Sequence, residues 1–250
     1  MSTQRAATAR ISLAIAMLLF TLASVTSASA AGYYPGGSTG SDISYPLCSS
    51  TQPSSMGAFG IVGVTAGRAF SQNGCLAIEF DWAKSKLATT LPSLYMNLQY
   101  PIGTTASYAM DGPKGKCSQK EKQCQASNYG WNAAKDAYLY AIGQGATSTS
   151  WWLDIETANS WSAKTALNEA VIQGALDYFG SNGITTGIYS TKRMWTTIAG
   201  SFQPAVESWV AQATEATAPG YCVPSGPFGT LQVALVQYVS GGQDWDYACP

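Results

Sequence analysis

The chain contains no histidine among its 250 residues, and only 11% of them are charged. The absence of His excludes Ser-His-Asp and Cys-His catalysis, His-ligated zinc and a histidine general base. The 13 Lys and Arg residues against 14 Asp and Glu residues give a formal net charge of −1. Nucleic-acid binding needs a clustered basic surface, so we expect no nucleic-acid partner. Carboxylates, Lys, Tyr and Cys remain for acid–base chemistry near neutral pH.

The first 30 residues have the layout of a secretory signal peptide. Arg5 and Arg10 form a charged region, residues 11–25 are apolar, and small residues lead to a cleavage site after Ala30. A membrane anchor is the alternative, but the apolar run is shorter than the ~20 residues that span a bilayer. No later segment has the length to be transmembrane. We therefore expect a secreted, extracellular protein with no membrane partner after cleavage.

The six cysteines are an even number, which in an exported chain indicates disulfide bonds. Six cysteines allow fifteen pairings, and loop closure favours neighbours along the chain. No C-x-x-C pair and no His accompany them, so neither a metal site nor a catalytic thiol is expected, and the sequence indicates no cofactor. The predicted pairs are Cys48–Cys75, Cys117–Cys124 and Cys222–Cys249.

After a Gly- and Ser-rich lead-in at residues 31–40, predicted as flexible, short β-branched or aromatic runs alternate with helical patterns. This alternation indicates βαβ units and a parallel sheet. Seven or eight strands in one chain of this length favour a single-domain, irregular (β/α) TIM-like barrel over residues 41–250, with few helices after residue 200. The predicted strands are 42–45, 59–65, 93–98, 149–156, 185–190, 208–212, 232–239 and 244–247, and the predicted helices are 74–87, 128–142, 165–179 and 192–199.

Residues 101–127 form a long connection after the third predicted strand. It contains Cys117 and Cys124 and four lysines. We expect a disulfide-pinned insertion. A solvated charged loop is favoured here over a functional basic patch.

Two carboxylates end the fourth predicted strand. Asp154 and Glu156 share one face because strand side chains alternate, and two strand positions span ~6.6 Å. In a (β/α) barrel the carboxyl ends of the strands open onto the active site. Glycoside hydrolysis uses such a pair, one carboxyl protonated and the other ionised. The alternative is that both acids are solvated and cap the following helix, since acids favour helix N-termini.

A series of short motifs resembles glycoside hydrolase family 25, the muramidases that cut peptidoglycan. The resemblance covers residues 41–248 and implies an irregular (β/α) barrel with an acidic groove and a polysaccharide substrate. Its specificity comes from the order of the motifs. They are Asp-Ile-Ser, Ile-Val-Gly-Val-Thr-Ala-Gly, Leu-Asp-Ile-Glu, Thr-Gly-Ile-Tyr-Ser, Trp-Val-Ala, Val-Gln-Tyr and Gln-Asp-Trp-Asp.

The resemblance also implies roles for individual residues. Glu156 becomes the proton donor, and Asp154 orients the substrate's 2-acetamido group or stabilises an oxocarbenium-like transition state. Asp42 and Asp244 shape the field and hydrogen-bond the substrate. Asp246 takes the place of the Asn in the family's closing Asp-x-Asn. The third strand departs from the family, because Leu94-Tyr95-Met96-Asn97 lacks the usual Tyr-His pattern.

Aromatic residues suit the faces of sugars as well as a barrel core. Trp152 shares the parity of the two acids and is expected to point inward below the site, whereas Trp209 is interpreted as structural. A barrel that binds polysaccharide without cleaving it, or a surface structural protein, is the alternative function, and we expect a monomer. The candidate substrate-binding residues are Tyr189, Trp161, Tyr238 and Trp245, together with Asp246.

Overall fold

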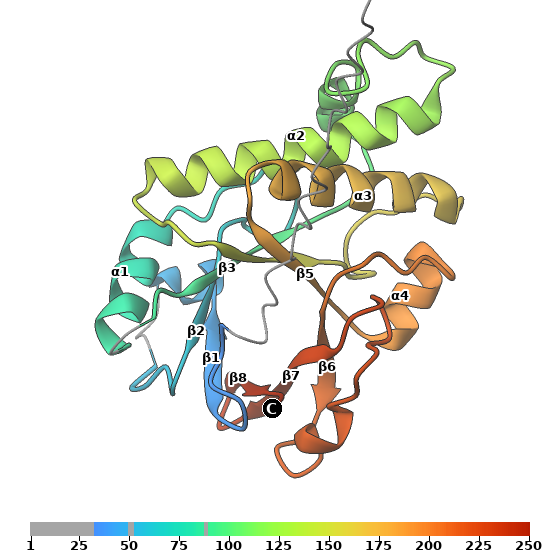
Figure 1. The fold of residues 1–250 in the computed structure, drawn as a ribbon. Coiled ribbons are helices and arrows are strands. Elements are labelled where there is room, and N and C mark those ends of the chain that lie inside the picture. The colour runs from blue at the N-terminus through green and yellow to red at the C-terminus, as the bar shows by residue number, and fades with distance from the viewer. Residues whose placement is uncertain (1–32, 50–52, 88–89) are drawn as a thin grey trace, which may run out of the picture.

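The computed structural model describes residues 33–49, 53–87 and 90–250, so the predicted signal peptide lies outside the described residues. Eight strands close into one barrel and follow one another around it in chain order (Figure 1). The predicted single-domain (β/α) TIM-like barrel is confirmed. The strands are β1 (Thr39–Ile43), β2 (Gly60–Gly63), β3 (Ser93–Asn97), β4 (Ser150–Asp154), β5 (Thr185–Ser190), β6 (Ser208–Ala213), β7 (Val233–Ser240) and β8 (Gln243–Ala248).

Four α-helices lie outside the barrel, with α2 and α3 packed side by side (Figure 1). After α4 the connections contain only one short 3-10 helix, so the last part of the barrel is irregular, as predicted. None of the described helices combines the length and apolarity that crossing a bilayer demands. The helices are α1 (Leu76–Lys86), α2 (Lys122–Gly143), α3 (Thr165–Ser181) and α4 (Lys192–Ala199), and the 3-10 helices are η2 (Tyr45–Ser49), η3 (Gly103–Ala109) and η4 (Ala218–Tyr221).

The last strand runs against the others. Neighbouring strands from β1 to β7 are parallel, but β8 pairs antiparallel with both β7 and β1. The sequence pattern suggested a parallel sheet, and this prediction is wrong for the last strand. Because β8 is reversed, its first residues lie at the same mouth as the last residues of β1 to β7. The pairing with β8 also explains why β1 begins at Thr39, three residues before the predicted strand.

The strands separate two apolar clusters. Trp151 and Leu153 of β4 belong to the outer cluster beneath the helices, whereas Trp152 lies in a smaller cluster inside the barrel. This alternation confirms that Trp152 points inward. Tyr34 also enters the inner cluster, where its hydroxyl accepts a 2.8 Å hydrogen bond from Trp152 Nε1. Tyr34, which belongs to the predicted flexible lead-in, is thus packed inside the barrel.

All three predicted disulfides are present, and no free cysteine occurs among the described residues. Cys48–Cys75 joins η2 to the start of α1, and Cys222–Cys249 joins the segment after η4 to the residue following β8. Two of the three bonds therefore fasten excursions back onto the barrel.

The third disulfide, Cys117–Cys124, pins the insertion to the first turn of α2. This helix begins at Lys122, earlier than the predicted start at Asn128. Asn128 instead lies inside the helix, where its Oδ1 accepts from Lys114 N at 2.9 Å and its Nδ2 donates to Gly115 O at 2.8 Å. The predicted helix start is therefore an anchor for the insertion.

Candidate active site

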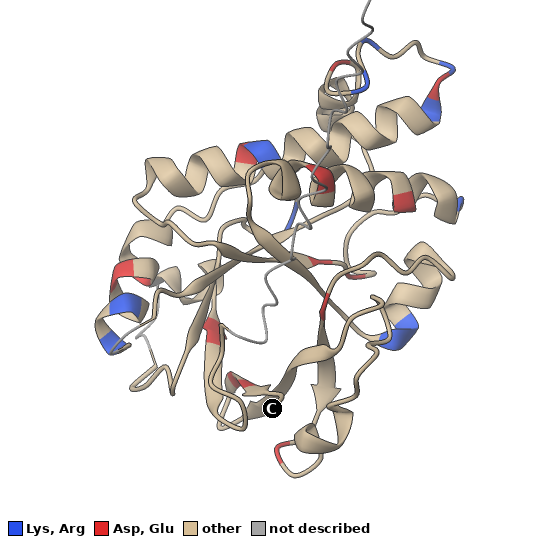
Figure 2. Cartoon of the chain, in the orientation of Figure 1, with Lys and Arg blue, Asp and Glu red and all other residues tan. Residues whose placement is uncertain are grey.

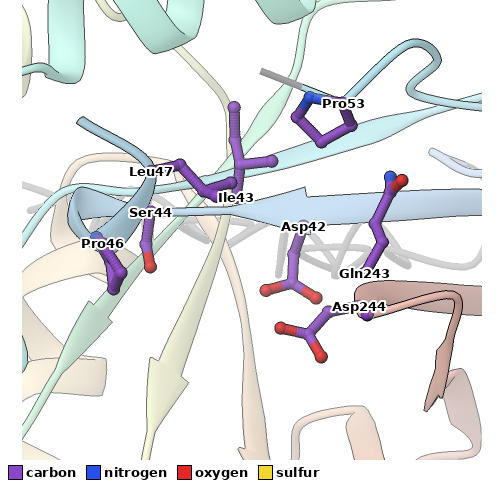
Figure 3. A pocket seen from close by; sticks show the side chains of 9 residues that line it. Asp42, Ile43, Ser44, Pro46, Leu47, Pro53, Gln243 and Asp244 are labelled. Carbon is purple, nitrogen blue, oxygen red and sulfur yellow. The ribbon is translucent and has the colours of Figure 1, made fainter. Parts of the chain in front are cut away.

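Carboxylates from three parts of the chain meet at one mouth of the barrel. Asp42 is the penultimate residue of β1, and Asp154 ends β4 with Glu156 two residues beyond it. Asp244 lies near the start of the reversed β8, which brings it to the same mouth. In Figure 3 the carboxyl groups of Asp42 and Asp244 point toward each other across a pocket. The structure thus brings together the four acids that the sequence singled out as catalytic.

No positive charge is built into the barrel wall. The eight strands contain four aspartates but no Lys or Arg, and the basic residues that the structure describes lie on helices and connecting segments (Figure 2). No positive charge within the strands therefore offsets the mutual repulsion of the acids. Burial is a second effect, because it disfavours the charged form of each carboxyl group. Both effects favour the protonated form of the carboxyl groups.

The pKa values of the four acids are raised accordingly. Burial, and secondarily the charge of Asp244, raises the pKa of Asp42 to about 7. Burial raises the pKa of Asp154 well above its usual range, with Glu156 and Asp42 adding to the effect. Burial also raises the pKa of Glu156 and of Asp244. Burial and mutual repulsion therefore act on all four acids in the same direction, toward retention of the proton.

A short chain of hydrogen bonds orients Asp154. Asn97 of β3 donates through Nδ2 to Asp154 Oδ2, and Thr65 Oγ1 donates to Asn97 Oδ1 at 2.7 Å. The register explains the first contact, because Asn97 and Asp154 are direct partners across β3 and β4. The other carboxyl oxygen, Asp154 Oδ1, is buried and has no hydrogen-bond partner among the described residues. The hydrogen-bonding capacity of that oxygen is therefore unfilled within the described part of the chain.

A second chain orients Asp42. Tyr189 of β5 donates its hydroxyl to Gln237 Oε1 at 2.8 Å, and Gln237 Nε2 donates to Asp42 Oδ2 at 2.8 Å. Burial and the surrounding carboxylates raise the pKa of Tyr189, so that it remains a protonated donor. Because Tyr189 occupies the oxygen of the Gln237 amide, the amide nitrogen is fixed toward Asp42.

Aromatic rings form the floor beneath these acids. Trp209 of β6 packs edge-on against Trp152, Tyr95 and Tyr189, with ring centroids 5.7, 6.2 and 4.6 Å away. Its Nε1 donates to Asp246 Oδ1 at 2.7 Å. Trp209 is buried in the inner cluster, in agreement with its interpretation as structural, and it also contacts one of the buried acids. Asp246 itself is buried below the mouth, where it holds other side chains in place.

The segment after β4 holds Glu156 by its backbone. Trp161 Nε1 donates to Glu156 O at 2.8 Å, and the indole ring is only partly buried. Trp161 thus lies beside the backbone of the proton-donor candidate while its ring packs against the outer apolar cluster, and its place in the groove stays a prediction.

Two of the predicted sugar-binding aromatics face away from the interior of the barrel. Tyr238 and Trp245 are paired across β7 and β8 and belong to, or pack against, the outer apolar cluster. Their neighbours Gln237 and Asp246 take the inner face, and strict alternation sends Tyr238 and Trp245 outward. The assignment of these two aromatics to the groove is therefore corrected.

Five residues of the site were not singled out from the sequence. Each acts through a side chain whose partner comes from another strand, so that its role could not be read from the short motifs, although Thr65, Trp209 and Gln237 lie within them. The parity of each residue with an inward-facing acid or aromatic was the available signal. They are Thr65, Tyr95, Asn97, Trp209 and Gln237.

The pocket of Figure 3 extends from Asp42 and Asp244 along the end of β1. Ser44, Pro46 and Leu47 form one side, and Gln243 and Asp244 at the start of β8 form another. It is a mixed polar and apolar surface beside the carboxylates. Among the described residues no group of three or more potential ligands is placed to hold a metal ion.

The fold and these side chains define a (β/α) barrel with an acidic mouth over an aromatic floor. Residues 121–220, which include Asp154 and Glu156, match the model of a family described as Lysozyme-like protein 1. Over those residues the match confirms the lysozyme-like resemblance predicted from the motifs. No curated protein matches the chain.

Several solved structures are similar at low identity. The Cpl-1 endolysin, crystallised with a peptidoglycan analogue, is 12% identical over 86% of this chain and 54% of its own, with a TM-score of 0.48. The catalytic domain of endolysin ply40 from bacteriophage P40 of Listeria monocytogenes is 17% identical over 85% of this chain and 92% of its own (TM-score 0.47). Autolysin LytC from Streptococcus pneumoniae is 16% identical over 84% of this chain and 45% of its own (TM-score 0.48). The chain therefore spans about half the length of Cpl-1 and LytC.

Proposed function

We propose that this chain is a secreted glycoside hydrolase of the family 25 type that cleaves a cell-wall glycan of the peptidoglycan class. The observation that carries the proposal is the state of Asp154. One of its oxygens is held by Asn97, and the other is buried without a partner beside a second acid, Glu156. A buried acceptor left open at a barrel mouth fits a substrate donor, such as the N–H of a 2-acetamido group.

The two acids then divide the work. Glu156, whose pKa is raised by burial, gives its proton to the glycosidic oxygen as the bond to the anomeric carbon breaks. Asp154 accepts a hydrogen bond from the acetamido N–H, or it stabilises the positive charge that develops on the sugar. When water attacks the anomeric carbon, Glu156 takes the proton back and the site is restored. Asp42 and Asp244 hold substrate hydroxyl groups along the pocket.

Further features support export and a glycan ligand. Three disulfides favour an oxidising compartment outside the cytosol. The partly exposed Trp161 ring and the inward Tyr189 provide apolar and hydrogen-bonding surface beside the acids. Both are residues that suit the faces and hydroxyl groups of sugars.

The test is the release of new reducing ends from purified peptidoglycan, with the loss of turbidity followed in parallel and chitin as a second substrate. We expect wild-type protein to cleave peptidoglycan, and Glu156→Gln to bind it without cleaving it. Glu169→Gln on the outer helix α3 is the matched control and should cleave normally. Binding without any new reducing ends in the wild type would replace the enzyme with the polysaccharide-binding alternative.

A further inference from the structure

The inner face of β8 carries a carboxyl group with an incomplete set of hydrogen-bond donors. Asp246 is fully buried, and its Oδ1 accepts from Trp209 Nε1 at 2.7 Å. Among the described residues no N–H or hydroxyl donor reaches Oδ2. The Asp42 carboxyl lies beside this side chain, because Asp246 pairs with Gly40 of β1 and with Gln237 of β7, and Gln237 itself donates to Asp42. Two ionised carboxylates are both acceptors only, so that a hydrogen bond between them requires a proton on one of them.

The surroundings decide which of the two acids holds the proton. Asp42 borders the pocket and is 9% exposed, whereas Asp246 is 0% exposed. Asp42 also accepts a hydrogen bond from Gln237 Nε2, which cannot turn away because Tyr189 holds the amide oxygen. The charged form is therefore better solvated and better hydrogen-bonded on Asp42.

We propose that Asp246 is a protonated positioning residue, whose O–H donates to Asp42 and keeps that carboxylate ionised and oriented at the mouth of the barrel. An Asn side chain would make the same two contacts, accepting from Trp209 and donating to Asp42 through its amide nitrogen. The consequence for catalysis rests on the proposed function, but the position of the proton does not.

The groups that face Asp246 reinforce this arrangement. The titratable neighbours are Asp42 from β1, Asp244 from β8 and Tyr189 from β5, the outward-facing Tyr238 of β7 interacts with Asp246 through its charge, and the strands contain no Lys or Arg. Burial raises the pKa of Asp246, Asp42 and Asp244 raise it further, and the Trp209 hydrogen bond opposes them. The folded chain therefore binds this proton more tightly than the unfolded chain. Its contribution to stability is complete below the ordinary pKa of Asp and is lost as pH rises through the folded pKa.

Infrared spectroscopy of the full chain locates the proton directly. At pH 7 we expect the wild type to show a protonated carboxylic acid C=O band that is missing in Asp246→Asn and retained in Asp42→Asn. A band that is lost in Asp42→Asn and retained in Asp246→Asn would place the proton on Asp42 and overturn the proposal. If Asp246→Asn does not fold, Asp246→Ala, which removes the same carboxyl group, takes its place, and a band retained in that variant overturns the proposal.

Chemical unfolding measured between pH 5 and pH 8 gives an independent test. The wild-type unfolding constant should rise with pH up to about tenfold more per pH unit than that of Asp246→Asn, since one bound proton is removed from the linkage. Asp177→Asn, which changes an exposed carboxyl on α3, is the control and should follow the wild type. Parallel slopes for wild type and Asp246→Asn would contradict the proposal.

Activity separates this inference from the proposed function. On peptidoglycan, Asp246→Asn should keep most of the wild-type kcat, and Asp246→Ala should lose about tenfold because Asp42 loses a donor. Equal losses in both variants would mean that the donor to Asp42 is not what matters. If the wild type cleaves no glycan, the proposed function fails, and the infrared and unfolding results still decide where the proton lies.

Discussion

Gln237 donates to the carboxylate of Asp42 over 2.8 Å although 195 positions separate the two residues in the chain. The contact exists because β1 and β7 both flank the reversed strand β8, whose side chains complete the inner face between them. One acid at the mouth of the barrel thus depends on an amide from near the end of the chain, which depends in turn on Tyr189 of β5. The state of each acid is set by the whole circle of strands.

Glu156→Gln should reduce the rate of glycan cleavage by about 10²–10⁴-fold, because the amide keeps the shape but cannot transfer a proton. Steady-state kinetics on peptidoglycan measures the loss, and circular dichroism checks the fold. Since the pKa of Glu156 is raised, the proton should be retained to a higher pH than in an ordinary Glu. Wild-type activity should then fall on the alkaline side as Glu156 ionises. A Glu156→Gln variant with wild-type kcat would end its assignment as proton donor.

Asn97→Ala should lower kcat by about 10- to 100-fold, because it removes the hydrogen bond that orients Asp154. Thr65→Val should have a smaller effect in the same direction, since Thr65 acts on Asp154 only through Asn97. Kinetics of both variants, with melting temperatures recorded in parallel, would separate positioning from folding. Full activity in Asn97→Ala would show that Asp154 needs no such support.

Gly187→Ala should destabilise the fold by about 1–3 kcal/mol or more through overpacking. Gly187 is on the inner face of β5, and a Cβ there would overlap the ring of Trp152. Gly180 in α3 has open space around the same position, so that Gly180→Ala should stabilise the helix by up to ~1 kcal/mol. Urea unfolding of the two variants gives both numbers. Equal stabilities would mean that the inner packing can shift to accept a methyl group.

Replacing both cysteines of one disulfide by Ser should destabilise the chain according to the length of the loop that the bond closes. Cys48–Cys75 and Cys222–Cys249 each span 27 residues, and the expected loss is about 3.5 kcal/mol for either bond. Cys117–Cys124 spans 7 residues, and the expected loss is about 2.5 kcal/mol.

Chemical unfolding of the three double variants gives this ranking, and thiol labelling of the native wild type should find no reactive cysteine. Two or more labelled thiols in the native protein would contradict the pairing.

Local pattern was enough to predict most of the fold. Strands such as Thr185–Ser190 and helices such as Lys192–Ala199 coincide with the predicted ranges, because side-chain periodicity and turn residues act over a few positions. The disulfide pairs followed from loop closure between neighbouring cysteines. The acids Asp154 and Glu156 were found because a strand that ends in two carboxylates is itself a local signal.

The tertiary structure alone decided what surrounds those acids. The reversal of β8 could not be read from its six residues, because strand direction is set by pairing with β1 and β7. It is this reversal that places Asp244 at the mouth, and the register of β8 with β1 and β7 sets Asp246 on the inner face and Tyr238 and Trp245 on the outer face. The roles of the supporting residues Asn97, Gln237 and Trp209 could likewise not be read locally, although Gln237 and Trp209 lie within short motifs, since a hydrogen bond across a closed barrel joins strands that the sequence keeps far apart. The local sequence therefore determined the helices, the strands and the positions of the acids. Closure of the barrel determined which side chains contact those acids and how strongly their pKa values are raised.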